Sequence, residues 1–304
     1  MELEKKLSTA AFELKTRYNL SINEKNDTLL KVFEEKLKSK DAVLTATVQQ
    51  LLKYVPVKLL KNWTPKGIQS QSGYSKKEID EFYSEPSKNM GPYTLSLSNS
   101  RPARLMVQLN PKFADYFVNN LLILKDFCYY NLVLFLEKRN PGVPNIAQKI
   151  INKLDRDSLA KQKELFDQYF KHHKNSMTSI YNNSLIDMTD YAIDHFIPWT
   201  FMYSDLIYNL VPIDKTTNSQ KSNNLPNCKY IEKLALFHYE LVQGINSGIY
   251  KAKDKIITDY LSLGAENIKA LATNNPTKFT DLFLQRLSPL LQIAKSNGFN
   301  EWIN

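Results

Sequence analysis

Residues 193–226 combine, over a short stretch, the side-chain types that hydrolysis of a phosphodiester bond requires. They include a carboxylate, an imidazole, two amides and an ammonium group: Asp194, His195, Asn209, Asn218 and Lys221. Oxygen ligands suit a hard divalent cation, so Asp194 and Asn218 are the candidate ligands of Mg²⁺ or Mn²⁺. A histidine that is neutral near pH 7 can take the proton of an attacking water, which makes His195 the candidate general base.

Two short apolar stretches predict the strands that position these groups. Residues 193–197 alternate enough to form a strand, so Asp194 and His195 should point to opposite sides of it. Residues 210–213 form a second strand, in which Pro212 implies an edge position or a bulge.

A helix is expected to begin near Lys215, because either Asp214 or Thr216 can cap it. Asn218 and Lys221 lie three residues apart and share one face of this helix. Lys221 would reach a phosphate oxygen, and Asn209 would hold the loop or orient His195. Lys215 is a candidate contact to nucleic acid.

In this order the stretch resembles the signature of the HNH endonuclease family. The matching elements are Asp-His-x-x-Pro at 194–198, Asn209, Asn-x-x-Lys-Ser at 218–222 and Leu-Pro at 225–226. The version most similar to it occurs in the HNH domain of RNA-guided CRISPR nucleases and in stand-alone bacterial restriction and defence nucleases. The resemblance implies a ββα-metal module in which Asp194 and Asn218 bind the metal, His195 is the base, and Lys221 is an electrostatic helper. Asn209 would be the middle asparagine of the motif.

The chain departs from the family in two respects. Many HNH proteins are braced by zinc-binding CxxC pairs, whereas the two cysteines here, Cys128 and Cys228, form no such pair. Helices on either side must therefore brace the module. A chain of 304 residues also leaves no room for a guide-RNA architecture, so RNA-guided cutting is not implied.

The charge balance favours an anionic partner. The net charge is +9, and most basic residues are lysines, which bind phosphates diffusely rather than read bases. Double-stranded DNA is the expected partner, and a cytoplasmic location without membrane contact is expected from the unpaired cysteines and the absence of an apolar signal core. One site per chain would cut one strand at a time. We therefore expect either nicking or a homodimer that cuts both strands.

The rest of the chain indicates an α+β protein that is mostly α. We expect a helical region with a β-hairpin over 1–110, a helical connector over 111–175, the HNH module over 176–228 and a helical region over 229–304. The hairpin, with strands at 93–97 and 104–109 and with Arg101 and Arg104 at its tip, is either the wing of a winged-helix DNA-binding domain or a cover for a helical core. Residues 121–136 are expected to form a buried helix.

Other residues with chemical potential have simpler interpretations. His172 and His173 are adjacent on a helix and diverge, so they should not share a metal ion. His238 falls in the apolar register of its helix and is expected in the core, while Trp199 is expected to pack rather than stack on a base. Phosphate-binding loops and serine- or zinc-protease motifs are absent from the sequence.

Three functions remain after this reasoning. The first is a metal-dependent DNA endonuclease of restriction or antiphage defence, acting alone or with a partner subunit of the defence system. The second is a nucleic-acid-binding or complex-forming subunit with an inactive or dormant HNH module, and the third is a ribonuclease.

Overall fold

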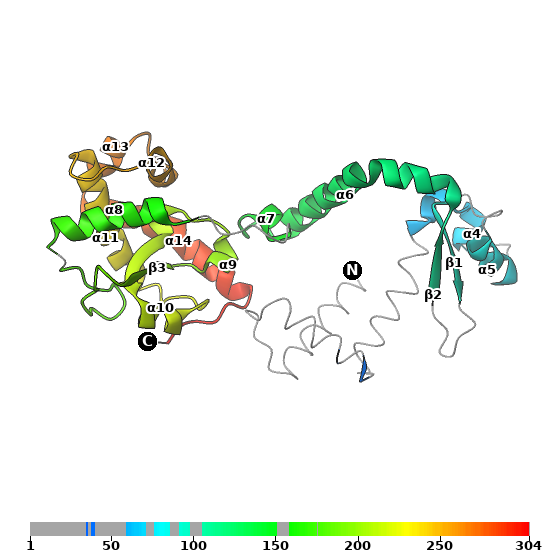
Figure 1. Cartoon of the computed structure of the whole chain (residues 1–304), viewed down its shortest axis with the longest axis horizontal. Helices are drawn as coiled ribbons and strands as arrows, with labels where there is room; N and C mark the ends of the chain where they lie inside the picture. The colour runs from blue at the N-terminus through cyan, green and yellow to red at the C-terminus, as the bar shows by residue number, and fades with distance from the viewer. Residues whose placement is uncertain are drawn as a thin grey trace. The chain divides into compact units, whose positions relative to one another are not determined.

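A computed structural model describes residues 35, 38–39, 59–70, 76–85, 91–97, 105–150, 158–174 and 176–303 (Figure 1). The chain divides into two compact units, residues 1–128 and 129–304. Among the described residues helices dominate and the strands form small two-stranded sheets, so the fold is α+β and mostly α. In the part of the chain that is described, no helix is both long and apolar enough to cross a membrane.

The first unit contains a short 3-10 helix, small helices and a hairpin. The elements are η1 (Lys61–Trp63), α4 (Lys66–Ser70), α5 (Lys76–Ser84), β1 (Tyr93–Leu97), β2 (Leu105–Leu109) and the start of α6 (Pro111–Arg139). The strands β1 and β2 pair antiparallel, with Tyr93 opposite Leu109. The predicted hairpin is therefore present, but its tip, including Arg101 and Arg104, lies outside the described residues. The winged-helix interpretation remains a prediction.

Helix α6 corrects one expectation. Its apolar residues recur at helical spacing, yet no residue of α6 is buried, and Leu122 and Val118 are among the most exposed. The expected core residue Cys128 is exposed as well. Periodicity identifies which residues share a face of a helix, whereas burial also requires another element to cover that face.

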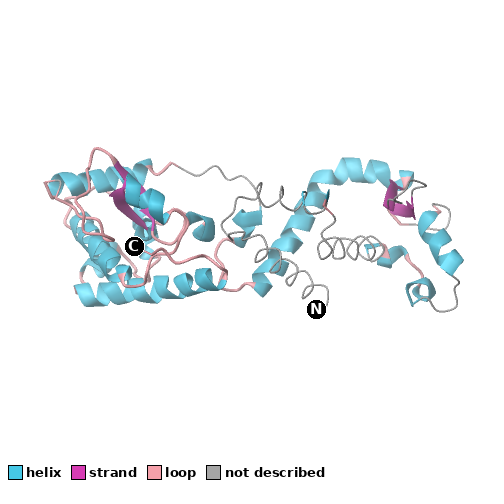
Figure 2. Ribbon diagram, turned by 90° about the horizontal axis from the view of Figure 1, so that it is seen from below, coloured by secondary structure: helices cyan, strands magenta, loops and turns pink. Residues whose placement is uncertain are grey.

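The second unit surrounds a two-stranded sheet with helices (Figure 2). Its elements are α7 (Ile146–Ile150), α8 (Ala160–His172), β3 (Tyr191–His195), α9 (Trp199–Met202), η2 (Ile207–Asn209), β4 (Leu210–Asp214), α10 (Lys215–Lys221), α11 (Tyr230–Asn246), α12 (Asp254–Leu261), α13 (Ile268–Ala272) and α14 (Pro276–Ser296). Large aromatic side chains are fully buried in one continuous core: Phe166, Phe170, Phe196, Phe201, Tyr208, Tyr260, Phe279 and Phe283.

The strands β3 and β4 are antiparallel, with Asp194 opposite Val211 and Ile193 opposite Pro212. Pro212 is tolerated because each strand of a two-stranded sheet has an open edge. Strand β3 ends at His195 and begins earlier than predicted. The Phe196 N–H still donates to the Asn209 carbonyl in the register of the ladder, but the Ile197 N–H donates to the Asn209 side chain, so regular pairing ends there.

The C-terminal segment contacts both ends of this module. The backbone N–H of Leu225 donates to the Asn300 carbonyl at 2.8 Å, and the N–H of Trp302 donates back to the Leu225 carbonyl at 2.8 Å. The Trp302 ring also contacts the ring of Tyr181 edge-on at 5.1 Å. Tyr181, which precedes β3, and Leu225, which follows α10, thus contact a C-terminal loop that is distant in sequence, whereas the prediction named helices as the brace.

Candidate active site

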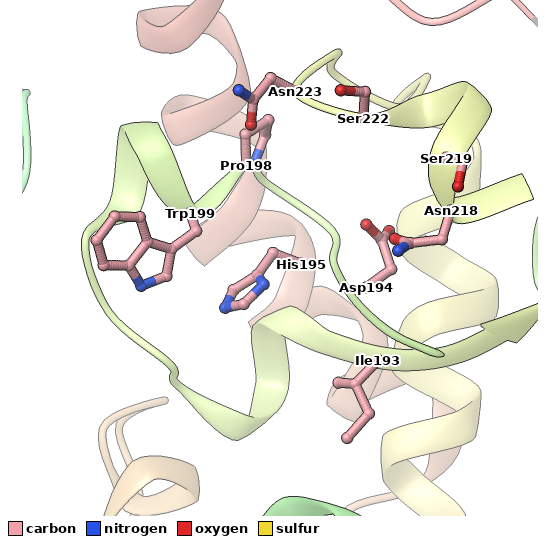
Figure 3. Close-up of a pocket in the computed structure, with 9 residues that line it drawn as sticks. All are labelled: Ile193, Asp194, His195, Pro198, Trp199, Asn218, Ser219, Ser222 and Asn223. Carbon is pink, nitrogen blue, oxygen red and sulfur yellow. The ribbon is translucent and has the colours of Figure 1, made fainter. Parts of the chain in front are cut away.

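One cleft brings together Asp194, His195 and Asn218, three of the five residues that the motif predicted to act together. It measures about 340 Å³ and is lined by Ile193, Asp194, His195, Pro198, Trp199, Asn218, Ser219, Ser222 and Asn223. Figure 3 shows the Asp194 carboxylate beside the Asn218 side chain, with the His195 imidazole extending toward Trp199. The divergence of Asp194 and His195 follows from their successive positions on β3.

Local capping chemistry sets the start of the helix that carries Asn218. The Asp214 carboxylate accepts a hydrogen bond from the backbone N–H of Thr217 at 2.8 Å, and α10 begins at Lys215. Asp214 is therefore the N-cap, one of the two candidates that the sequence offered. With β4 ending at Asp214, the helix starts directly from the strand and places Asn218 opposite Asp194.

The Asp194 carboxylate is held on both of its oxygens. Its Oδ1 accepts from Lys221 Nζ at 3.0 Å, and its Oδ2 accepts from the Tyr181 hydroxyl at 2.9 Å. Only 4% of the Asp194 side chain is exposed, and none of the Lys221 side chain. Burial, and then the neighbouring Asp194 carboxylate, raises the pKa of Tyr181 well above its ordinary value, so this hydroxyl remains a donor.

Lys221 has a different place from the one expected. Its ammonium donates to Asp194 and also to the His195 backbone carbonyl at 2.8 Å, and it does not line the cleft. A fully buried ammonium that is engaged in these bonds cannot contact a phosphate in the cleft. We therefore correct the role of electrostatic helper to that of a residue that holds Asp194 and the end of β3.

His195 has a carboxylate partner that the motif analysis did not include. The His195 Nε2 atom lies 2.7 Å from Asp205 Oδ1. The side chains are 11% and 13% exposed, so the pair is largely but not completely removed from water.

Asn209 fastens the turn that follows His195. Its side-chain oxygen accepts from the Ile197 N–H at 2.9 Å, and its amide nitrogen donates to the Ile197 carbonyl at 2.9 Å. The residue is completely buried and does not line the cleft. Of its two expected roles, this geometry supports the first, that of holding the loop.

Of the three residues expected to contact nucleic acid, Lys215 is described, whereas Arg101 and Arg104 lie outside the described residues. Lys215 lies on the surface and pairs with Asp190, an exposed partner. Trp199 lines the cleft and stacks on Tyr203, with ring centroids 4.4 Å apart. Packing, the expected role of Trp199, is therefore present.

The donor set fits a hard divalent cation. Asp194 and Asn218 supply oxygen atoms to the same cleft, and each Asp194 oxygen retains a second lone pair besides its hydrogen bond. Over the described residues, no group of three or more His, Cys, Asp or Glu side chains could hold a metal ion. A cation bound here would thus take few protein ligands and keep several waters, a pattern typical of Mg²⁺.

The other histidines are explained without a ligand. His238 is fully buried, its Nδ1 lies 2.7 Å from the Tyr260 hydroxyl, and its Nε2 lies 3.0 Å from the Leu210 carbonyl. Burial lowers the pKa of His238 to about 3, so the ring is neutral. This confirms that it is a core histidine. His172 and His173 contact each other edge-on, with ring centroids 5.3 Å apart.

Sequence reasoning missed two residues that contact the candidate site, Tyr181 and Asp205. Tyr181 precedes β3 and carries no pattern that would link it to Asp194. Asp205 lies between the histidine and the middle asparagine of the motif, so an acid in that loop was the one available signal.

Comparison with known families agrees with this geometry. Residues 176–227 match the family model described as HNH endonuclease, so this segment is an HNH module. The family is in general one of nucleases, and the match supports nuclease activity at that level. Comparison with curated proteins and with solved structures gave no match.

Proposed function

We propose that this chain, with its HNH module at residues 176–227, is a divalent-metal-dependent endonuclease that hydrolyses the phosphodiester bonds of DNA. The observation that carries the proposal is the convergence of Asp194, His195 and Asn218 on one cleft. The CRISPR-like or restriction-like character of the motif, and a role in bacterial restriction or antiphage defence, are part of the proposal.

His195 is the general base. The imidazole takes a proton from a water molecule, the water oxygen forms the new bond to phosphorus, and the leaving oxygen departs with the electron pair of the broken P–O bond and takes a proton from solvent. Asp194 and Asn218 would hold Mg²⁺ or Mn²⁺, which when bound offsets the charge that develops on the phosphate and the leaving oxygen. Lys221 and Tyr181 keep the Asp194 carboxylate in place.

DNA as the substrate is supported by the charge balance. The net charge of +9, carried mostly by lysines, attracts a polyanion with little base discrimination. Lys215, one turn before the cleft residue Ser219, is a candidate phosphate contact at the edge of the site. Arg101 and Arg104 remain candidate contacts on sequence grounds.

Plasmid cleavage tests the proposal. Wild-type protein and His195→Ala are incubated with supercoiled DNA and Mg²⁺ or Mn²⁺, with EDTA as the metal control and an RNA of the same sequence as the substrate control. We expect the wild type to cut DNA and to lose this activity with EDTA. The variant should cut about 10²–10⁴-fold more slowly, the usual contribution of a general base. An intact plasmid under every metal, with and without candidate partners, would refute the proposal.

A dormant module within a binding subunit is the second candidate, and one observation favours it. Both oxygens of Asp194 are engaged by buried donors, which compete with a cation for the carboxylate. Under this alternative His195→Ala leaves DNA binding and biological activity intact. Under the nuclease proposal, it abolishes cleavage while DNA affinity stays near that of the wild type.

A further inference from the structure

Asp205, in the loop after α9, faces His195. A carboxylate can accept a hydrogen bond but cannot donate one, so at the 2.7 Å contact the hydrogen must reside on His195 Nε2. The neutral ring then carries its unshared pair on Nδ1. We propose that Asp205 is the positioning residue of the general base, and that it keeps the hydrogen on Nε2 of His195. This inference rests on the proposed function.

Asp205 contacts the ring from outside the cleft. The cleft lining includes His195 but not Asp205, so the acid occupies one nitrogen while the imidazole still borders the space where substrate and water would lie. A ring held at Nε2 cannot flip without losing a charge-assisted hydrogen bond. The contact therefore selects both the tautomer and the orientation of His195.

Limited solvent exposure strengthens this pair. With only 11% of His195 and 13% of Asp205 exposed, the carboxylate interacts with the imidazole through less water than a surface pair does. The contact therefore holds the ring in one orientation more firmly than an exposed pair would.

Helices outside the HNH segment hold the Asp205 loop in place. Gln162 on α8 donates from Nε2 to the Asp205 backbone carbonyl at 3.4 Å. Asp259 on α12 accepts from the Ile207 N–H at 3.1 Å. The loop is anchored at Asp205 itself and at Ile207 by residues that are not part of the matched segment, which explains how the flanking helices contribute to the site.

The tautomer can be measured without metal, substrate or activity. Full-length protein labelled with ¹⁵N-histidine has four imidazoles, and the His195 signals are assigned by their loss in His195→Gln. His238, whose Nε2 donates to a backbone carbonyl, is an internal reference for the Nε2–H form. We expect His195 of the wild type to show a protonated Nε2 and a bare Nδ1 above the pH at which the ring protonates, and Asp205→Asn to lose this signature.

Kinetics provide the second readout. We expect Asp205→Asn to lower kcat by about 100-fold or more with KM within about threefold, since the wrong tautomer and a misaligned base affect the chemical step. Asp187→Asn is the matched control, because Asp187 is an exposed acid of the same module whose carboxylate accepts from the nearby Thr189. This control should behave as the wild type does.

The outcomes separate the inference from the nuclease proposal. A wild-type His195 with hydrogen on Nδ1, or an Asp205→Asn enzyme that cleaves at the wild-type rate, overturns the role of Asp205. A protein that never cleaves nucleic acid but shows the Nε2–H signature, lost in Asp205→Asn, removes the nuclease function and supports the assignment of the contact. If Asp205→Asn fails to fold, the wild-type spectrum still decides.

Discussion

Replacing Lys221 with methionine tests the ion pair that the structure buries beneath the cleft. The substitution keeps an unbranched side chain one atom shorter but removes the ammonium that donates to Asp194 at 3.0 Å and to the His195 carbonyl at 2.8 Å. Asp194, only 4% exposed, then keeps the Tyr181 hydroxyl as its donor and loses its counter-charge. Breaking one partner of a buried pair costs about 3–5 kcal/mol of unfolding free energy.

That cost translates into a measurable melting shift. For a unit of this size, about 1 kcal/mol corresponds to roughly 2–4 °C, so Lys221→Met should lower the Tm by about 6–20 °C. Fluorescence in a Trp63→Phe background reports on the second unit, because Trp199 and Trp302 both lie there. Trp302 contacts Tyr181, the other donor to Asp194, and is therefore a local probe.

An exposed ion pair of the same helix is the matched control. Lys215 pairs with Asp190, but their side chains are 62% and 63% exposed, so Lys215→Met should cost less than about 1 kcal/mol. The double substitution Asp194→Asn with Lys221→Met should cost less than the sum of the two single changes, because no unpaired charge remains. Equal melting temperatures for Lys221→Met and Lys215→Met would refute the reasoning.

Two further predictions concern the loop and the core. Asn209→Ala should lower the unfolding free energy by about 2–4 kcal/mol, because the Ile197 N–H and carbonyl lose their partners in a buried turn. Denaturant titration measures this change, and Asn223→Ala, at the cleft edge, is the control. His238 has its pKa lowered to about 3 by burial, so the unfolded chain binds a proton below pH 6.5 that the folded chain does not. The contribution of His238 to the unfolding free energy is fully present above that pH and should fall by about 1.4 kcal/mol per pH unit toward pH 3. Calorimetry should find this slope reduced in His238→Gln.

Local sequence patterns were sufficient for the core of the module. The spacing of Asp194, His195 and Asn218, two short apolar stretches and an acid able to cap the next helix are all determined over a few residues. The backbone follows them: β3, β4 and α10 appear in that order, with Asp214 as the cap. Strand ends were less predictable, because the Asn209 side chain accepts the Ile197 N–H and so ends the regular pairing of β3.

Helix α6 illustrates what periodicity cannot supply. The spacing of its apolar residues correctly predicts a helix over Pro111–Arg139, yet every one of its residues is at least partly exposed. Helix formation depends on contacts a few residues apart, whereas burial depends on where other segments lie.

Three residues that line the candidate cleft, Asp194, His195 and Asn218, are recognisable in the sequence alone from residue type and spacing. Only the tertiary structure decided what each of their neighbours does. Lys221 and Asn218 share a face of α10, but Lys221 lies nearly one turn further along the helix and enters the core, where it meets Asp194. Asp205 meets His195 because α8 and α12 hold its loop, and contacts between segments distant in the chain carry no local signal in the residues that make them.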